Sequence, residues 1–214
     1  MKRAVHFILK KLGLLSLYSL RRSGYLFDKG WFQSFRAKAS VDRSGRPIPW
    51  MTYAFLDFLE PRLRGDFDVF EFGSGNSTHW WAARVRAVSS CEHDAEWFAR
   101  VSEGVPPNAT VLHRSVTNQA YRSVLREDDH VGQPYDVIVI DGVDRVGCAL
   151  NCLESLRPDG VVIWDNSDRS DYEEGYEFLL GQGFRRLDFH GLGPINVMAW
   201  CTSVFYREEN CLGL

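Results

Sequence analysis

Residues 69–78 read Val69-Phe70-Glu71-Phe72-Gly73-Ser74-Gly75-Asn76-Ser77-Thr78. A short apolar run reaches an acid, passes through a glycine-rich turn and enters a helix that we predict over residues 78–85. Gly73 and Gly75 allow positive φ and let a ligand come close to the backbone. The free amides at the start of the helix favour polar or anionic ligand groups. The stretch therefore predicts a strand, a tight loop and a helix N-terminus that together hold a nucleotide-like cofactor.

The spacing of the glycines bears on which cofactor that is. A dinucleotide fingerprint has a third glycine three residues after the second, and in this chain that position is Thr78. The sequence therefore favours a nucleoside without a pyrophosphate over NAD or FAD. The segment from Glu71 to Ser77 resembles the first motif of the class I S-adenosylmethionine-dependent methyltransferases. The alternative is a purely structural strand–turn–helix unit.

Predicted strands and helices alternate from residue 68 to residue 183, which indicates parallel βαβ units. The last two predicted strands have no helix between them, so we expect them to pair antiparallel. The strands are expected over 68–72, 87–92, 110–113, 135–141, 160–165, 184–190 and 197–206. Helices are expected over 50–59, 95–101, 117–126, 144–156 and 172–180, and a turn over 157–160.

This arrangement is similar to the class I methyltransferase architecture. The resemblance implies an α/β fold, with a three-layer α/β/α, Rossmann-like sheet of seven strands in the order 3-2-1-4-5-7-6 and strand 7 antiparallel. We expect residues 1–45 to form an N-terminal helical accessory segment and residues 46–214 to form the methyltransferase domain.

Ligands of a doubly wound sheet bind at the carboxyl ends of its strands, so the polar residues there are the candidates for cofactor contacts. The resemblance gives Glu92, at the end of the second strand, the two ribose hydroxyls. Asp94 is the alternative, although it also suits a helix N-cap. Ser115 follows the third strand, where many relatives place an acid. The predicted cofactor-binding residues are Glu71, Gly73, Ser74, Gly75, Asn76, Ser77, Glu92, His93, Ser115, Asp141 and Gly142.

Acids also end the fourth and fifth predicted strands. Asp141 and the pair Asp165-Asn166 are similar to the metal site of catechol- and caffeoyl-CoA-type O-methyltransferases. That resemblance implies Mg²⁺ or another divalent cation on these three oxygen donors. In the metal-free alternative Asp141 contacts the methionyl amine, while Asp165 and Asn166 cap the next helix. In both cases Asp141 is the predicted catalytic residue, as a base acting directly or through the ion.

The predicted activity is O-methylation of a small-molecule or saccharide acceptor. Five aromatic residues and one amide are candidates for the acceptor pocket: Trp50, Tyr53, Trp164, Tyr172, Trp200 and Asn196. An NAD-dependent oxidoreductase is a second interpretation, and a non-catalytic nucleoside-binding or scaffold domain is a third. The sequence does not determine the oligomeric state.

Composition and charge limit the kinds of partner and the cellular compartment that we expect. The net charge is −3, so we expect no nucleic-acid partner. Five cysteines without a C-x-x-C pair predict buried thiols and a cytoplasmic protein. In the first 22 residues, leucines recur on one helical face among Lys and Arg residues. We favour a helix packed on the domain; the other interpretation is peripheral membrane contact through residues 1–22.

Overall fold

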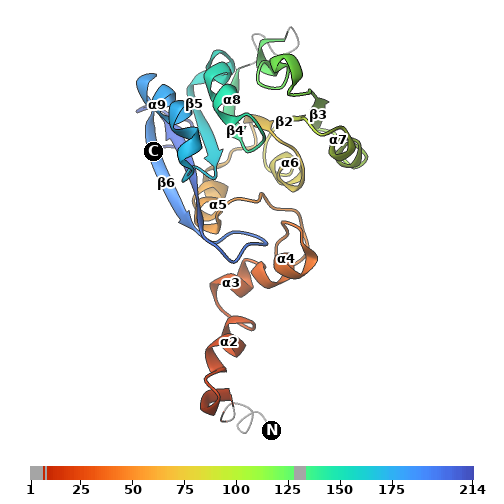
Figure 1. The fold of residues 1–214 in the computed structure, drawn as a ribbon, viewed down its shortest axis with the longest axis vertical. Coiled ribbons are helices and arrows are strands. Elements are labelled where there is room, and N and C mark those ends of the chain that lie inside the picture. Colours follow the sequence, from red (N-terminus) through yellow and green to blue (C-terminus); the bar gives the residue numbers. More distant parts are fainter. Residues whose placement is uncertain (1–6, 8, 128–133) are drawn as a thin grey trace.

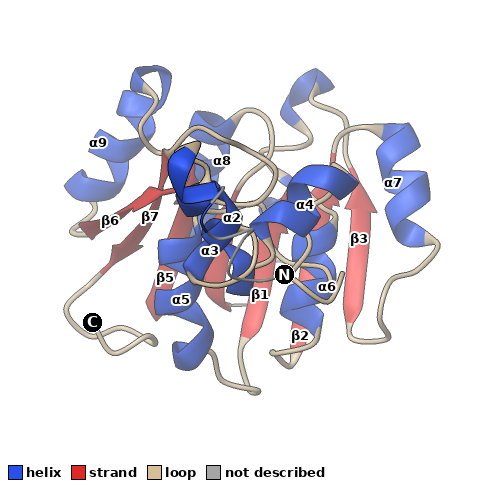
Figure 2. Ribbon diagram, turned by 90° about the horizontal axis from the view of Figure 1, so that it is seen from below, coloured by secondary structure: helices blue, strands red, loops and turns tan. Residues whose placement is uncertain are grey.

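The structure, a computed structural model, describes residues 7, 9–127 and 134–214. Its centre is a seven-stranded sheet in the order β3-β2-β1-β4-β5-β7-β6, with helices on both faces (Figures 1 and 2). β7 runs antiparallel to β5 and β6, and the other neighbouring strands are parallel. The predicted fold class and strand order are therefore confirmed.

The elements follow one another as strand and helix through most of the chain. The strands are β1 (Asp68–Phe72), β2 (Ala87–Glu92), β3 (Ala109–His113), β4 (Tyr135–Ile140), β5 (Leu156–Asp165), β6 (Arg185–Gly191) and β7 (Trp200–Tyr206). The helices are α2 (Leu15–Leu20), α3 (Tyr25–Asp28), α4 (Trp31–Ala37), α5 (Tyr53–Leu59), α6 (Asn76–Ala82), α7 (Ala95–Ser102), α8 (Arg145–Cys152) and α9 (Glu173–Gly181).

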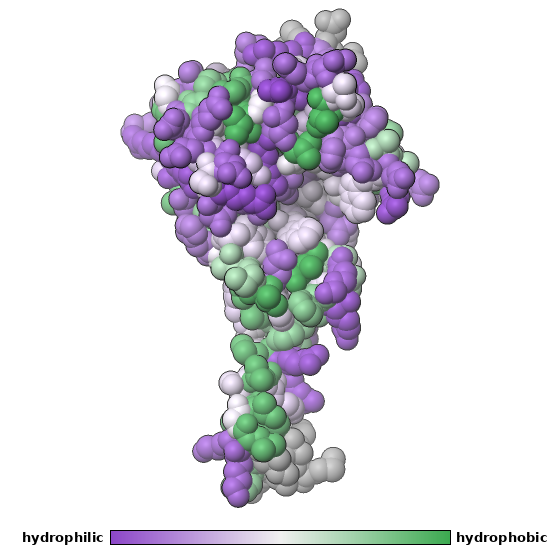
Figure 3. Space-filling view, viewed as in Figure 1, coloured by the Kyte–Doolittle hydropathy of each residue, from purple (hydrophilic) through white to green (hydrophobic). Residues whose placement is uncertain are grey.

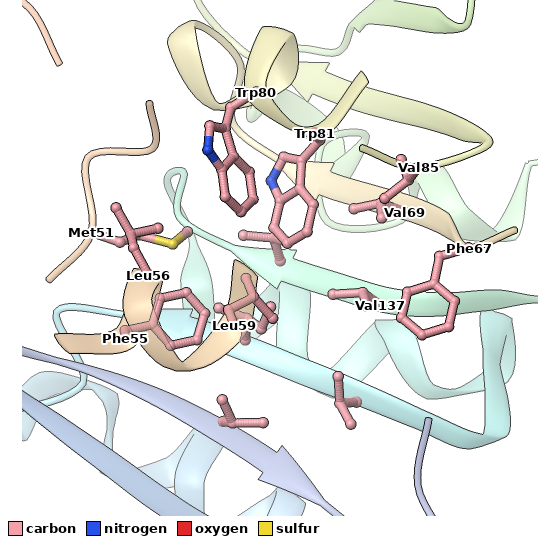
Figure 4. Close-up of a cluster of buried hydrophobic side chains, with 14 of the residues drawn as sticks. Met51, Phe55, Leu56, Leu59, Phe67, Val69, Trp80, Trp81, Val85 and Val137 are labelled. Atoms are coloured by element: carbon pink, nitrogen blue, oxygen red, sulfur yellow. The ribbon is translucent and has the colours of Figure 1, made fainter. Parts of the chain in front are cut away.

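Both faces of the central strands are buried, which explains their continuous apolar runs. In β4, Val137 and Val139 join the core cluster that α5 and α6 cover, while Ile138 and Ile140 join the cluster beneath α8 and α9. Figure 4 shows side chains of α5 and α6 converging over Val69 and Val137 of the sheet. Helices on both faces thus leave the carboxyl edge of the sheet as the place for a ligand.

Two local predictions were wrong. Residues 117–126 do not form a helix but two short 3₁₀ turns, Thr117–Gln119 and Val124–Arg126. Asn118 and Gln119 have φ of 55° and 64°, a left-handed conformation that interrupts a right-handed helix. Residues 157–160 belong to β5 and not to a turn.

The five cysteines are buried and unpaired, as predicted. Cys148 and Cys152 lie on the face of α8 that packs on the sheet. Within the described ranges, no helix is both long enough and apolar enough to cross a bilayer.

The N-terminal helices lie beyond the carboxyl edge of the sheet, and α2 extends away from the domain (Figure 1). The Trp31 indole donates to the carbonyl of Asn196 at 2.8 Å, and the Tyr25 hydroxyl donates to Asp57 of α5 at 2.7 Å. α2, by contrast, buries none of its residues. The preferred interpretation of residues 1–22, a helix packed on the domain, is therefore wrong for α2; residues 1–6 and 8 lie outside the described residues.

Candidate functional site

The turn between β1 and α6 is built around two glycines with positive φ. Gly73 has a φ of 107°, and a Cβ there would lie 3.3 Å from the Asp141 carbonyl oxygen, a tight contact with backbone. Gly75 has a φ of 149°, and its amide donates to the Thr78 hydroxyl at 3.1 Å. The loop is thereby held against the end of β4.

Thr78, where the dinucleotide fingerprint has glycine, links this turn to a buried acid. Its hydroxyl donates to Glu71 Oε2 at 2.8 Å, and the Ser90 hydroxyl donates to the same oxygen at 2.9 Å. Glu71 Oε1 is buried with no hydrogen-bond partner within the described structure. Burial raises the pKa of Glu71 to about 7. The Glu71 carboxyl can therefore accept a positive charge that the free protein does not supply.

Glu92 is held in one orientation at the end of β2. Its Oε1 accepts the backbone amides of His93 and Asp94 at 2.8 and 2.9 Å, and its Oε2 accepts the Ser74 hydroxyl at 3.1 Å. Oε1 is saturated by these two amides, whereas Oε2 keeps a lone pair for a ligand hydroxyl. Asp94 instead caps α7 by accepting the Trp97 amide at 2.8 Å, which confirms the helix-cap interpretation of that residue.

At the next strand ends, Arg145 lies between two acids. Its guanidinium pairs with Asp141 Oδ1 at 3.1 Å and donates to the carbonyls of Gly142 and Asp165. Asp165 Oδ1 accepts the Trp200 indole at 2.9 Å and the Thr202 hydroxyl at 2.5 Å. Burial raises the pKa of both Asp141 and Asp165; Arg145 opposes the rise at Asp141, and the charge of Asp141 adds to the rise at Asp165.

Glu71, Glu92 and Asp141 line a cleft of about 500 Å³ at the carboxyl ends of β1, β2 and β4. Four of its lining residues are acids and none is Lys or Arg. The cleft is lined by Glu71, Gly73, Ser74, Ser77, Glu92, His93, Asp94, Trp97, Asp141, Gly142 and Val143.

A second cavity, of about 540 Å³, adjoins the cleft and shares with it Ser74, Ser77, Trp97 and Asp141. Its other walls come from β5, the segment before β7, and the chain before α5. They include Lys38, Trp50, Asn76, Arg145, Asp165, Asn166, Arg169, Asn196 and Trp200. Unlike the cleft, this cavity mixes both signs of charge with tryptophan rings.

The structure brings most predicted site residues together. Eight of the predicted cofactor residues line the cleft, and Gly75 and Asn76 line the second cavity. Ser115 lines neither, and its hydroxyl accepts the Thr117 amide at 3.1 Å. Of the residues predicted for the acceptor pocket, Trp50, Asn196 and Trp200 line the second cavity, but Tyr53, Trp164 and Tyr172 do not, because they pack in or against the core.

Sequence reasoning missed Trp97 and Arg145. The Trp97 indole donates to the Ser74 carbonyl at 2.9 Å, so its ring covers the glycine turn although it comes from α7. A tryptophan in the first turn of a helix that follows a strand-end acid is the signal that was available. Arg145 stands four residues after Asp141, a spacing at which helical side chains meet.

Comparison with known proteins identifies the chemistry of this site. Residues 70–167 match a family model described as a methyltransferase domain. This chain contains a methyltransferase domain. The match begins in β1 and ends just after β5, so it spans the acids of the cleft and those of the second cavity. It is the domain of an S-adenosylmethionine-dependent methyltransferase. No curated protein matches the chain.

Solved structures share the fold of this methyltransferase. An rRNA methylase from Streptococcus thermophilus is 16% identical with a TM-score of 0.53, over 71% of this chain and 93% of that one. A precorrin-6y C5,15-methyltransferase from Geobacter metallireducens is 12% identical with a TM-score of 0.54, over 72% and 87%. A methyltransferase from Streptococcus mutans, solved with SAH, is 12% identical with a TM-score of 0.51, over 70% and 94%.

The acidic side chains of the cleft fit S-adenosylmethionine. That molecule has two positive centres, a sulfonium and an ammonium, against one carboxylate, and it has no phosphate. An acid-lined cleft without Lys or Arg suits such a ligand and disfavours a pyrophosphate. The unpartnered Oε1 of Glu71 is placed for a cationic group, and Glu92 Oε2 can accept one ribose hydroxyl.

The predicted metal donors fit a divalent ion poorly. Asp141, Asp165 and Asn166 do line one cavity, as predicted. However, the Arg145 guanidinium already places a positive charge against Asp141 and the Asp165 carbonyl. One oxygen of the Asp165 carboxyl is also saturated by Trp200 and Thr202. A second cation here would be repelled by Arg145, so no step described below involves a metal.

Proposed function

We propose that this methyltransferase O-methylates a small hydroxyl-bearing acceptor, such as a saccharide, bound in the cavity beside the cofactor cleft. The observation that carries the proposal is the position of Asp141. Its side chain lies on the wall common to the cleft and the second cavity, where a donor methyl group and an acceptor oxygen have to meet. It is thus placed to act on the acceptor hydroxyl.

S-adenosylmethionine, when bound, supplies a methyl group on an already activated carbon. The protein has to align the acceptor, remove its proton and keep water out. Asp141 accepts the hydroxyl proton, and Arg145 holds the Asp141 carboxylate in place through the ion pair at 3.1 Å. Trp97 closes one side of the site by stacking over the Gly75 turn.

The walls of the second cavity favour an acceptor with a ring and an anionic group. Trp50 and Trp200 offer flat apolar faces of the kind on which sugar and aromatic rings pack. Lys38 and Arg169 bring positive charges that are absent from the cofactor cleft. A hydroxylated ring bearing a carboxylate or phosphate combines both features.

Two other functions remain as alternatives. An NAD-dependent oxidoreductase would need to place a pyrophosphate among four acids, which is unfavourable. A non-catalytic nucleoside-binding domain would keep the cleft but would not need Asp141 on the wall of a second cavity.

Titration calorimetry with S-adenosylhomocysteine and with NADH separates the first alternative; we expect binding of the former only. Transfer of a labelled methyl group to a panel of hydroxy acids, sugar phosphates and phenols tests for catalysis and for the class of acceptor. Running it with EDTA and with Mg²⁺ tests for a metal. We expect an acidic hydroxyl compound to be methylated at a rate that EDTA does not reduce. Binding of S-adenosylhomocysteine without transfer to any compound would favour the non-catalytic interpretation. A rate abolished by EDTA would support the predicted divalent metal site.

A further inference from the structure

The charges of this chain are unevenly distributed. Residues 1–41 contain nine of the 25 Lys and Arg residues but only one of the 28 Asp and Glu residues, Asp28. The net charge of −3 therefore combines a strongly basic N-terminal segment with a strongly acidic domain. Such a segment is attracted to anionic surfaces, while the domain behind it is repelled by them.

The same segment exposes apolar side chains. Among the described residues, fourteen large hydrophobic side chains are exposed, and seven of them lie between residues 9 and 35. Leu12 and Leu17 are 64% and 57% exposed, and Leu20 is 44% exposed. Figure 3 shows hydrophobic side chains along the protruding N-terminal part, whereas the face of the domain in this view is mostly hydrophilic. An exposed apolar surface of this kind marks an interaction site.

A basic, aromatic groove of about 790 Å³ is lined entirely by residues between 21 and 43. Phe27, Phe32 and Phe35 line it together with Arg21, Arg36, Lys38 and Arg43. The Arg21 and Arg43 guanidiniums lie 5.7 and 4.1 Å from the Phe32 and Phe27 ring centroids, and the Lys38 ammonium lies 4.4 Å from that of Phe35. In the described part of the chain, Arg21 and Lys38 have no acidic partner within 4.0 Å, so their charges are available to an anion.

Three kinds of occupant differ in how well they fit this surface. A nucleic acid would use the positive charges but would leave the exposed leucines in water. A second copy would cover the leucines but would bring two strongly basic segments together. An anionic lipid surface offers phosphates to the arginines and lysines, and acyl chains to the leucines.

We propose that residues 9–43 form a docking surface for an anionic lipid membrane. The apolar side chains of α2 enter the interface between headgroups and acyl chains, and the basic, aromatic groove binds a lipid phosphate. Lys38 lines both this groove and the acceptor cavity, so docking sets the entrance of that cavity close to the lipid surface.

Flotation of the full-length protein with vesicles tests the proposal. The vesicles are phosphatidylcholine alone, or phosphatidylcholine with phosphatidylglycerol. We expect binding mainly to the anionic vesicles. L17E/L20E is expected to weaken it at least about tenfold, because burial of two leucine side chains is lost. R21E/R22E is expected to weaken it by about twentyfold or more at low salt, since each basic residue contributes roughly fivefold.

Matched controls come from exposed positions of the domain. Leu180 of α9 is 46% exposed and the Arg100 side chain is 70% exposed, so L180E and R100E change the same kinds of residue elsewhere. We expect both controls to bind vesicles like the unmodified protein, and all variants to bind S-adenosylhomocysteine equally.

Three outcomes would overturn the proposal. The first is equal flotation of L17E/L20E and the unmodified protein. The second is a dimer in analytical ultracentrifugation that L17E/L20E dissociates, with no vesicle binding, which would identify a second copy as the occupant. The third is tight binding of an RNA oligonucleotide with no binding to phosphatidylglycerol vesicles.

Discussion

The cofactor cleft and the acceptor cavity share one wall but differ in charge. The cleft has four acids and neither Lys nor Arg among its lining residues, whereas the cavity adds Lys38, Arg145 and Arg169 to Asp141 and Asp165. The difference indicates how one strand edge can hold two unlike ligands. Under the proposed function, the acidic cleft selects a cationic nucleoside, and the mixed cavity accepts a neutral or anionic molecule.

The sharpest test of this comparison is the residue on the shared wall. D141N keeps the shape of the side chain but removes the base, so we expect kcat to fall by about 10²- to 10⁴-fold. S-adenosylhomocysteine affinity should change much less, because Glu71 and Glu92 remain. D144N is the control, since Asp144 pairs with Arg122 outside both cavities. A D141N enzyme that turns over like D144N would remove Asp141 from the mechanism.

Glu92 tests the acidic side of the comparison. E92Q replaces a charged acceptor of hydroxyl hydrogen bonds with a neutral one, which is expected to weaken S-adenosylhomocysteine binding by roughly 10- to 100-fold. Calorimetry measures the change. E96Q alters an exposed acid on α7 that lies outside the cleft and should bind normally. Equal affinities of E92Q and E96Q would mean that Glu92 makes no contact with the ribose.

Lys38 tests the mixed-charge side. K38Q is expected to raise KM for an anionic acceptor by roughly two- to fivefold, as is usual for an exposed ion pair, and to leave S-adenosylhomocysteine binding unchanged. R36Q removes a charge from the end of α4, two residues before Lys38 but outside the acceptor cavity, so its KM should stay normal. If K38Q instead weakened cofactor binding, the assignment of the two cavities to two ligands would be wrong.

The smallest predicted effect concerns Glu71 and the pH dependence of the stability of the fold. In the unfolded chain its carboxyl ionises near pH 4, but burial raises its pKa to about 7 in the fold. The folded form holds the proton more tightly, so this contribution to stability is greatest below pH 4 and is lost as the pH rises to about 7. Between pH 5 and 8 the Tm of E71Q should therefore fall less than the Tm of the unmodified protein, and the two falls should differ by a few °C.

Differential scanning calorimetry without ligand measures this difference, with E96Q as the control. Parallel Tm curves for E71Q and the unmodified protein across that range would show that Glu71 ionises in the fold as it does in the unfolded chain.

Local patterns were enough to predict the sheet. The apolar runs of β1, β4 and β5 reflect burial of both strand faces. Each run can therefore be recognised from its own residues, without reference to the rest of the chain. The glycines at 73 and 75 and the strand-end acids were found for the same reason, because turn geometry and strand ends are local properties. The prediction of a helix over residues 117–126 failed because Asn118 and Gln119 adopt left-handed φ there, which interrupts a right-handed helix.

What the sequence determined by itself was the class of fold and the glycine turn with its strand-end acids, since these follow from periodicity and turn chemistry within short windows. The strand order was expected from the resemblance to class I methyltransferases. Only the tertiary structure decided that Trp97 covers the glycine turn, that Arg145 stands between Asp141 and Asp165 where a metal was expected, and that α2 projects from the domain. These features depend on contacts between distant residues and on which surfaces remain uncovered, and no local pattern of residues specifies either.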